Sequence, residues 1–123
     1  MQYEVIIAED EELILNNLIQ KVNAHPAFKV IGSAQTGTDA LDLVKEHSPI
    51  LLMTDIRMPV MDGMELLSRV RECYPDMRFI IISGFSDFEY AREALHLKVY
   101  DYLLKPVSLD DIHEVLFRLQ KDL

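Results

Sequence analysis

Short apolar runs alternate with segments of helical periodicity along the whole chain. The runs are four or five residues long and rich in β-branched and aromatic residues, so they predict buried strands at 5–8, 28–32, 50–53, 79–82 and 100–104. After each run, apolar residues recur at intervals of three and four, which predicts a helix. The apolar positions of these helices lie within 15–22, 40–44, 66–70, 88–95 and 112–119.

Polar residues at the starts of four predicted helices support this division. Each start has a Ser, Thr or Asp followed three positions later by an acidic residue, which is the spacing of a capping box. The pairs are Thr36 with Asp39, Asp62 with Glu65, Ser86 with Glu89, and Ser108 with Asp111. Fully apolar strands that alternate with amphipathic helices predict a parallel sheet covered on both faces, so we expect an α/β fold, a (βα)5 doubly wound three-layer sandwich.

Composition narrows the class of protein. We expect residues 1–123 to form one domain, and the net charge of −9 argues against direct nucleic-acid binding by this chain and suits a cation or a basic partner. Cys73 is the single cysteine and cannot form an internal disulfide, which fits a reducing compartment. No apolar run approaches the ~20 residues that span a membrane, and the N-terminus lacks a signal-peptide pattern. We therefore expect a cytoplasmic protein.

Polar residues follow the predicted strands at their carboxyl ends. Glu9 and Asp10 follow the first strand, Asp55 follows the third, and Ser83 and Lys105 follow the fourth and fifth. In a parallel sheet these ends lie along one edge, where open α/β folds place their chemistry. If these four strands are neighbours, the five side chains converge on one pocket.

Clustered carboxylates require a positive charge nearby. Two like charges ~4 Å apart repel by about 4 kcal/mol at an effective dielectric of ~20. An all-oxygen set without His or a second Cys suits Mg²⁺, with Mn²⁺ as the alternative, and does not suit zinc. With Lys105 and the Ser83 hydroxyl added, such a site favours a phosphoryl group arriving on Asp55. Taken singly, each residue is also explained as a solvated charge or a turn residue, and the shared edge is what favours a site.

With these residues in hand, the chain closely resembles the receiver domain of two-component response regulators, over about residues 3–120. The resemblance rests on four motifs, which are Glu9-Asp10, the segment 54–63 around Asp55, Ser83-Gly84, and the segment 101–106 that ends in Lys105-Pro106. The segment 83–91 is similar to the subgroup whose receivers precede an AraC-type helix-turn-helix domain.

The resemblance implies a flavodoxin-like fold with strand order 2-1-3-4-5 and a role for each motif residue. Asp55 would accept a phosphoryl group from a sensor histidine kinase. Asp10, Asp55 and the backbone carbonyl of Arg57 would hold Mg²⁺, with Glu9 acting through water. Ser83 and Lys105 would each bind a phosphoryl oxygen.

The resemblance also implies a switch and a signalling role. Ser83 would move toward the phosphoryl group, Tyr102 would turn from exposed to buried, and the face of the fourth helix, fifth strand and fifth helix would change. Gly84 would leave room for the phosphoryl group, and the peptide bond before Pro106 would be cis. The chain would assist its own phosphorylation and dephosphorylation without being an enzyme in the usual sense.

The partners implied are a sensor histidine kinase and a C-terminal AraC-type DNA-binding output domain, which this chain does not contain. A homodimer on phosphorylation is compatible with the resemblance. Through the output domain, the switch would control transcription.

The chain departs from the family pattern at three places. Ser83 stands where Thr is frequent, although it supplies the same hydroxyl. Lys98 stands where the fourth helix usually ends in Gly, so a left-handed residue there would cost about 1–2 kcal/mol. Arg57 and Phe85 flank the expected path of hydrolytic water, and we expect the bulk of Phe85 to slow loss of phosphate.

Three other functions stay open at this point. A Mg²⁺-dependent phosphatase of the haloacid-dehalogenase type would need a second Asp where Arg57 stands. A flavin binder would need a neutral phosphate loop after the first strand, where Glu9 and Asp10 would repel phosphate. A receiver-like interaction module that works without phosphorylation is the third.

Overall fold

Five strands and five helices alternate along the described part of the chain, residues 2–84 and 90–123 of the computed structural model. Their order and bounds are β1 (Tyr3–Ala8), α1 (Glu12–Asn23), β2 (Phe28–Ala34), α2 (Gly37–His47), β3 (Leu51–Asp55), α3 (Gly63–Cys73), β4 (Arg78–Ser83), α4 (Ala91–His96), β5 (Asp101–Leu104) and α5 (Leu109–Asp122).

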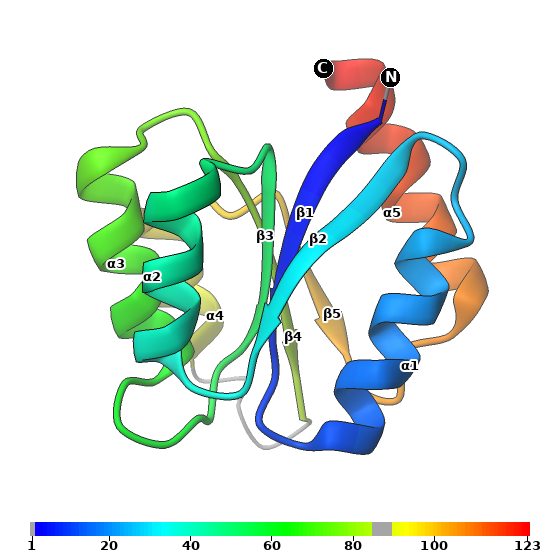
Figure 1. Ribbon diagram of the computed structural model, residues 1–123. Helices are drawn as coiled ribbons and strands as arrows, with labels where there is room; N and C mark the ends of the chain where they lie inside the picture. The colour runs from blue at the N-terminus through cyan, green and yellow to red at the C-terminus, as the bar shows by residue number, and fades with distance from the viewer. Residues whose placement is uncertain (1, 85–89) are drawn as a thin grey trace.

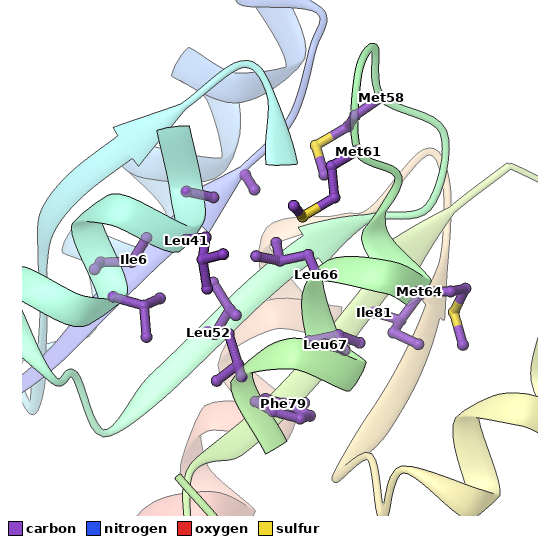
Figure 2. Close-up of a cluster of buried hydrophobic side chains, with 14 of the residues drawn as sticks. Ile6, Leu41, Leu52, Met58, Met61, Met64, Leu66, Leu67, Phe79 and Ile81 are labelled. Atoms are coloured by element: carbon purple, nitrogen blue, oxygen red, sulfur yellow. The ribbon is translucent and has the colours of Figure 1, made fainter. Parts of the chain in front are cut away.

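The strands form one parallel sheet in the order β2-β1-β3-β4-β5, which confirms the predicted topology. Helices α1 and α5 cover one face of the sheet, and α2, α3 and α4 cover the other (Figure 1). Each face has its own cluster of buried apolar side chains. Figure 2 shows the cluster beneath α2 and α3, where Ile6, Leu41, Leu52, Leu66 and Phe79 meet from five different elements.

Two central strands extend further than the apolar pattern predicts. The apolar run of the third strand stops at Met53, but β3 continues through Thr54 to Asp55, which pairs with Ile82 of β4. Similarly, β4 includes Ser83. The prediction placed both polar residues beyond their strands and was wrong, because backbone pairing continues where the side chains cease to be apolar. Both residues are therefore fixed by the sheet itself.

Three of the predicted helix caps are confirmed. The side chains of Thr36, Asp62 and Ser108 each accept a hydrogen bond from the backbone N–H three residues later. At α5 the capping box is complete, because the carboxylate of Asp111 also accepts from the N–H of Ser108. The fourth predicted pair, at 86 and 89, lies outside the described residues.

Helix α4 ends with a left-handed residue that is not glycine. Lys98 has φ of 57°, so of the two helix ends that the sequence left open, the structure has the left-handed one. Its N–H donates to Leu95 O at 3.1 Å and the Val99 N–H donates to Ala94 O at 3.2 Å, which together form a Schellman motif. Leu95 belongs to the apolar pattern of the predicted helix, yet its side chain is 78% exposed.

Candidate functional site

Three carboxylates meet at the carboxyl edge of the sheet. Glu9 and Asp10 follow β1, and Asp55 is the last residue of β3. One oxygen from each lies within 4.8 Å of the others. Glu9 and Asp55 are buried, at 0% and 5% exposure, whereas Asp10 is exposed. The structure thus brings together the acidic residues that the sequence placed at strand ends.

Lys105 joins two of these carboxylates from the far side of β4. Its Nζ lies 2.6 Å from Glu9 Oε1 and 3.0 Å from Asp55 Oδ2. The other oxygen of each carboxylate accepts a backbone N–H, Glu9 Oε2 from Glu11 at 2.9 Å and Asp55 Oδ1 from Ile56 at 2.7 Å. Both carboxylates are therefore held in fixed orientations.

The charges of the cluster do not balance. Burial raises the pKa of Glu9 to about 7, although its bond with Lys105 acts in the opposite direction. Burial also raises the pKa of Asp55, again against the effect of Lys105. Burial would lower the pKa of Lys105, but its bonds to Glu9 and Asp55 outweigh this and raise it. One ammonium group facing three carboxylates leaves negative charge at the site, and an oxygen-only donor set of this kind fits a hard divalent cation.

Ser83 and Tyr102 form a hydroxyl pair beside the cluster. The Oγ of Ser83, a fully buried residue, donates to the Tyr102 hydroxyl at 2.7 Å. Tyr102 is half-buried, so the structure does not show the exposed position that we expect before phosphorylation. The hydrogen bond with Ser83 accounts for the difference, because it holds the phenol against β4.

The remaining predicted residues surround the cluster. The side chain of Arg57 is exposed and lines an open pocket with Asp10, Pro59 and Tyr90. Gly84 directly follows Ser83 and is half-buried. The peptide bond between Lys105 and Pro106 is cis, as expected. Phe85 lies outside the described residues.

Sequence reasoning missed two features that shape the site. It assigned Lys105 to an incoming phosphoryl group and did not pair it with Glu9, whose side chain lies 2.6 Å away. It also gave no role to Gly63, although a Cβ there would lie 2.0 Å from Asp55 O. The Asp62-Gly63 dipeptide after the loop was the available signal for this close approach.

In the described ranges of the chain, no helix combines the length and hydrophobicity needed to cross a membrane.

Comparisons with known proteins agree with the geometry. The sequence profile of the response regulator receiver domain matches residues 5–117. The chain is 35% identical to the uncharacterized transcriptional regulatory protein YesN of Bacillus subtilis, over 97% of this chain and 34% of that protein. It is 38% identical to the transcriptional regulatory protein HptR of Staphylococcus aureus, over 98% of this chain and 48% of that protein.

Among solved structures, the receiver domain of AraT, a response regulator from Geobacillus stearothermophilus, superposes with a TM-score of 0.92 at 35% identity, over 99% of this chain and 95% of that one. The chain spans about a third to a half of the length of the curated relatives it matches. With its acidic cluster, its strand-end lysine and its 2-1-3-4-5 sheet, this chain belongs to the response regulator receiver domain family.

Proposed function

We propose that Asp55 accepts a phosphoryl group from the phosphohistidine of a sensor histidine kinase. The observation that carries this is the Lys105 ammonium, which lies 3.0 Å from Asp55 and 2.6 Å from Glu9 at the acidic cluster. In the transfer, a carboxylate oxygen of Asp55 attacks phosphorus and the P–N bond breaks. The imidazole nitrogen leaves with the bonding electron pair, and Asp55 becomes an acyl phosphate.

Asp10, Asp55 and the main-chain carbonyl of Arg57 would hold Mg²⁺, or Mn²⁺ in its place, with Glu9 acting through water. The oxygen-only donor set of Glu9, Asp10 and Asp55 supports this assignment. When bound, the cation neutralises charge on the phosphoryl oxygens.

Lys105 and Ser83 would bind the phosphoryl group after transfer. The Lys105 ammonium already faces Asp55, so a phosphoryl oxygen there gains a charge-assisted hydrogen bond. The Ser83 hydroxyl has a single proton, and its Oγ is hydrogen-bonded with the Tyr102 hydroxyl at 2.7 Å and lies 3.4 Å from Gly84 O. Donation to a phosphoryl oxygen would therefore release the Tyr102 hydroxyl and change β5. Gly84 would leave space beside Ser83, and Arg57 and Phe85 would limit the approach of hydrolytic water.

We infer that the altered surface of α4, β5 and α5 controls an output domain in a longer protein of the cytoplasm. Both curated relatives are named as transcriptional regulatory proteins and are two to three times as long as the matched region. A C-terminal AraC-type DNA-binding domain is the output we propose, with homodimer formation on phosphorylation as the means of control.

The direct test is incubation with Mg²⁺ and acetyl phosphate, followed by intact-mass measurement. We expect one phosphoryl group per chain, stable in acid and labile in base, and none in Asp55→Asn. Asp39→Asn, which removes an exposed carboxylate at the start of α2, is the control and should label like the unmodified chain.

Two outcomes would contradict the proposal. Turnover of many donor molecules without a phosphorylated chain would favour a phosphatase. Equal lack of labelling in the unmodified chain and in Asp55→Asn would favour a receiver-like module that works without phosphorylation.

A further inference from the structure

The guanidinium of Arg71, in α3, binds main-chain carbonyls of two separate connections. Its Nη1 donates to Met77 O at 2.7 Å and to Pro75 O at 2.9 Å, both between α3 and β4. Its Nε donates to Leu97 O at 3.0 Å, and its Nη2 lies 3.4 Å from Lys98 O, both between α4 and β5. The Arg71 side chain therefore links the C-terminal end of α4 to the connection that precedes β4 through hydrogen bonds.

The Arg71 side chain is itself held in place. Its Cζ lies 3.9 Å from the centroid of the Phe79 ring, and Phe79 is fully buried. Burial lowers the pKa of Arg71, but arginine keeps its charge in proteins. A stacked guanidinium with a planar fork of donors can bind several carbonyls at once, which a lysine ammonium cannot do in the same geometry.

The carbonyls of Leu97 and Lys98 are groups that need such a donor. The last carbonyls of a helix have no intrahelical partner and carry the negative end of the helix dipole. Lys98 also holds a left-handed conformation that is unfavourable for a residue other than glycine, so its surroundings must fix it. The Schellman hydrogen bonds hold this turn from within, and Arg71 adds a donor from α3 to its carbonyls.

This contact lies at the edge of the sheet opposite to the phosphorylation site. The connections that contain Met77 and Leu97 lead into the amino ends of β4 and β5, and Tyr100 N–H donates to Phe79 O at 2.7 Å there. Asp55, Ser83 and Lys105 lie at or beyond the carboxyl ends of their strands. In Figure 1 the two edges are at the top and the bottom of the sheet.

We propose that Arg71 is a positioning residue that fixes the C-terminal end of α4 both before and after phosphorylation. The rearrangement that follows Asp55 phosphorylation is then a pivot of α4 about Leu97–Val99, with the largest displacement at the end nearest Ser83. This inference rests on the proposed function, because it describes how the same switch moves.

The test compares Arg71→Met with Arg69→Met in the full chain by amide NMR. Arg69 is on the same helix, exposed, and paired with Glu65 at 3.9 Å, so it controls for loss of a positive charge from α3. In the unphosphorylated chain we expect hydrogen exchange at Leu97, Lys98 and Val99 to rise on the order of tenfold in Arg71→Met, since hydrogen bonds from a charged donor are lost. Arg69→Met should leave these rates unchanged.

A second measurement separates a pivot from a simple loss of stability. On addition of Mg²⁺ and beryllofluoride, a phosphoryl mimic, the amide signals of Leu97–Val99 should move little in the unmodified chain, while that of Tyr102 moves. In Arg71→Met the response should spread to Leu97–Val99. If Arg71→Met does not fold, Arg71→Lys is the second variant. It keeps the positive charge but loses the planar set of N–H donors, so the amide signals of Leu97–Val99 should also move when beryllofluoride is added.

The outcomes are distinct. Leu97–Val99 signals that move as much as Tyr102 in the unmodified chain overturn the pivot, as does an Arg71→Met response identical to that of Arg69→Met. If the unmodified chain binds no beryllofluoride, the proposed phosphorylation of Asp55 is contradicted. The proposed pivot of α4 is then contradicted as well, because it depends on that phosphorylation. The exchange rates then still decide whether Arg71 holds the end of α4.

Discussion

Val60 is the most strained residue of the loop between Asp55 and α3. Among the described residues, the non-glycine positions with positive φ are Ser48, Val60 and Lys98, and Val60 has the largest value, 71°. A β-branched side chain is especially unfavourable in this region. Val60 is also 89% exposed, so packing does not offset the strain. Strain of this kind is concentrated near functional sites.

We expect Val60→Gly to increase the free energy of unfolding by about 0.5–1 kcal/mol. Relief of a left-handed conformation is worth about 1–2 kcal/mol, and the greater freedom of glycine in the unfolded chain returns part of it. The measurement is the midpoint of urea unfolding. Val60→Ala keeps a Cβ in the left-handed region and should gain less. A Val60→Gly midpoint at or below that of Val60→Ala would contradict the explanation.

For single residues, the sequence predicts which residues belong to the site better than it predicts which side chains contact each other. Asp55, Glu9 and Lys105 could be found because strand ends in a parallel sheet share one edge. The Lys105–Glu9 bond could not, since it depends on how two side chains separated by most of the chain lie across the sheet. A left-handed Lys98 was one of two alternatives that the departure from the family pattern left open, whereas nothing in the sequence marks Val60 as left-handed.

At the element scale, helix α3 begins in direct contact with the end of β3. The Gly63 N–H donates to Ile56 O at 2.7 Å, and a Cβ at Gly63 would lie 2.0 Å from Asp55 O. Gly37, the first residue of α2, packs as closely on Met61 O, where a Cβ would lie 2.2 Å away. Two helix starts thus set the position of the loop that follows Asp55.

We expect Gly63→Ala to destabilise the chain by roughly 2 kcal/mol and to slow labelling of Asp55 by acetyl phosphate. The added Cβ meets backbone, so the end of β3 or the start of α3 must move, and overpacking of this kind costs about 1–3 kcal/mol. Urea unfolding and the rate of phosphorylation are the measurements. Gly32→Ala is the matched control, because its Cβ would lie at an ordinary 3.4 Å from Leu43 Cδ1. Similar losses in both variants would show that the clash at Gly63 is not the cause.

The sequence predicted the elements well and their ends less well. Apolar runs located all five strands, and capping residues such as Thr36 and Ser108 located helix starts because their side chains bind nearby N–H groups. The extension of β3 to Asp55 was missed, since backbone pairing leaves no mark in the hydrophobic pattern. The exposure of Leu95 was also missed, since α4 is only six residues long and too short to follow a full amphipathic pattern, with Ala94 buried and Leu95 exposed.

For the whole molecule, negative charge is in excess, and three of the carboxylates lie together where a cation is proposed to bind. The net charge is −9, and of the clustered Glu9, Asp10 and Asp55, Lys105 pairs with Glu9 and Asp55. Each negative charge raises the energy of the folded chain more than that of the extended chain. A divalent cation that binds the folded state should therefore stabilise the entire domain.

We expect Mg²⁺ to raise the thermal unfolding midpoint of the unmodified chain. At 100 times the dissociation constant, the stabilisation is about 2.7 kcal/mol by mass action. Asp10→Asn, which removes an exposed carboxylate of the cluster, should abolish most of this shift. Sodium chloride at equal ionic strength controls for general screening. An equal rise with sodium chloride, or an unchanged shift in Asp10→Asn, would count against a specific site.

The Lys105 bridge has a consequence for newly made chains. Lys105 follows β5 at the edge of the sheet, yet its partners lie at the ends of β3 and β1, two and three positions away in the strand order. The ammonium reaches Asp55 only when β5 lies beside β4 in the sheet. A chain that has not completed its sheet would therefore present Asp55 without its counter-charge. If Asp55 accepts a phosphoryl group as proposed, such a chain would lack the ammonium that binds this group and would accept it poorly.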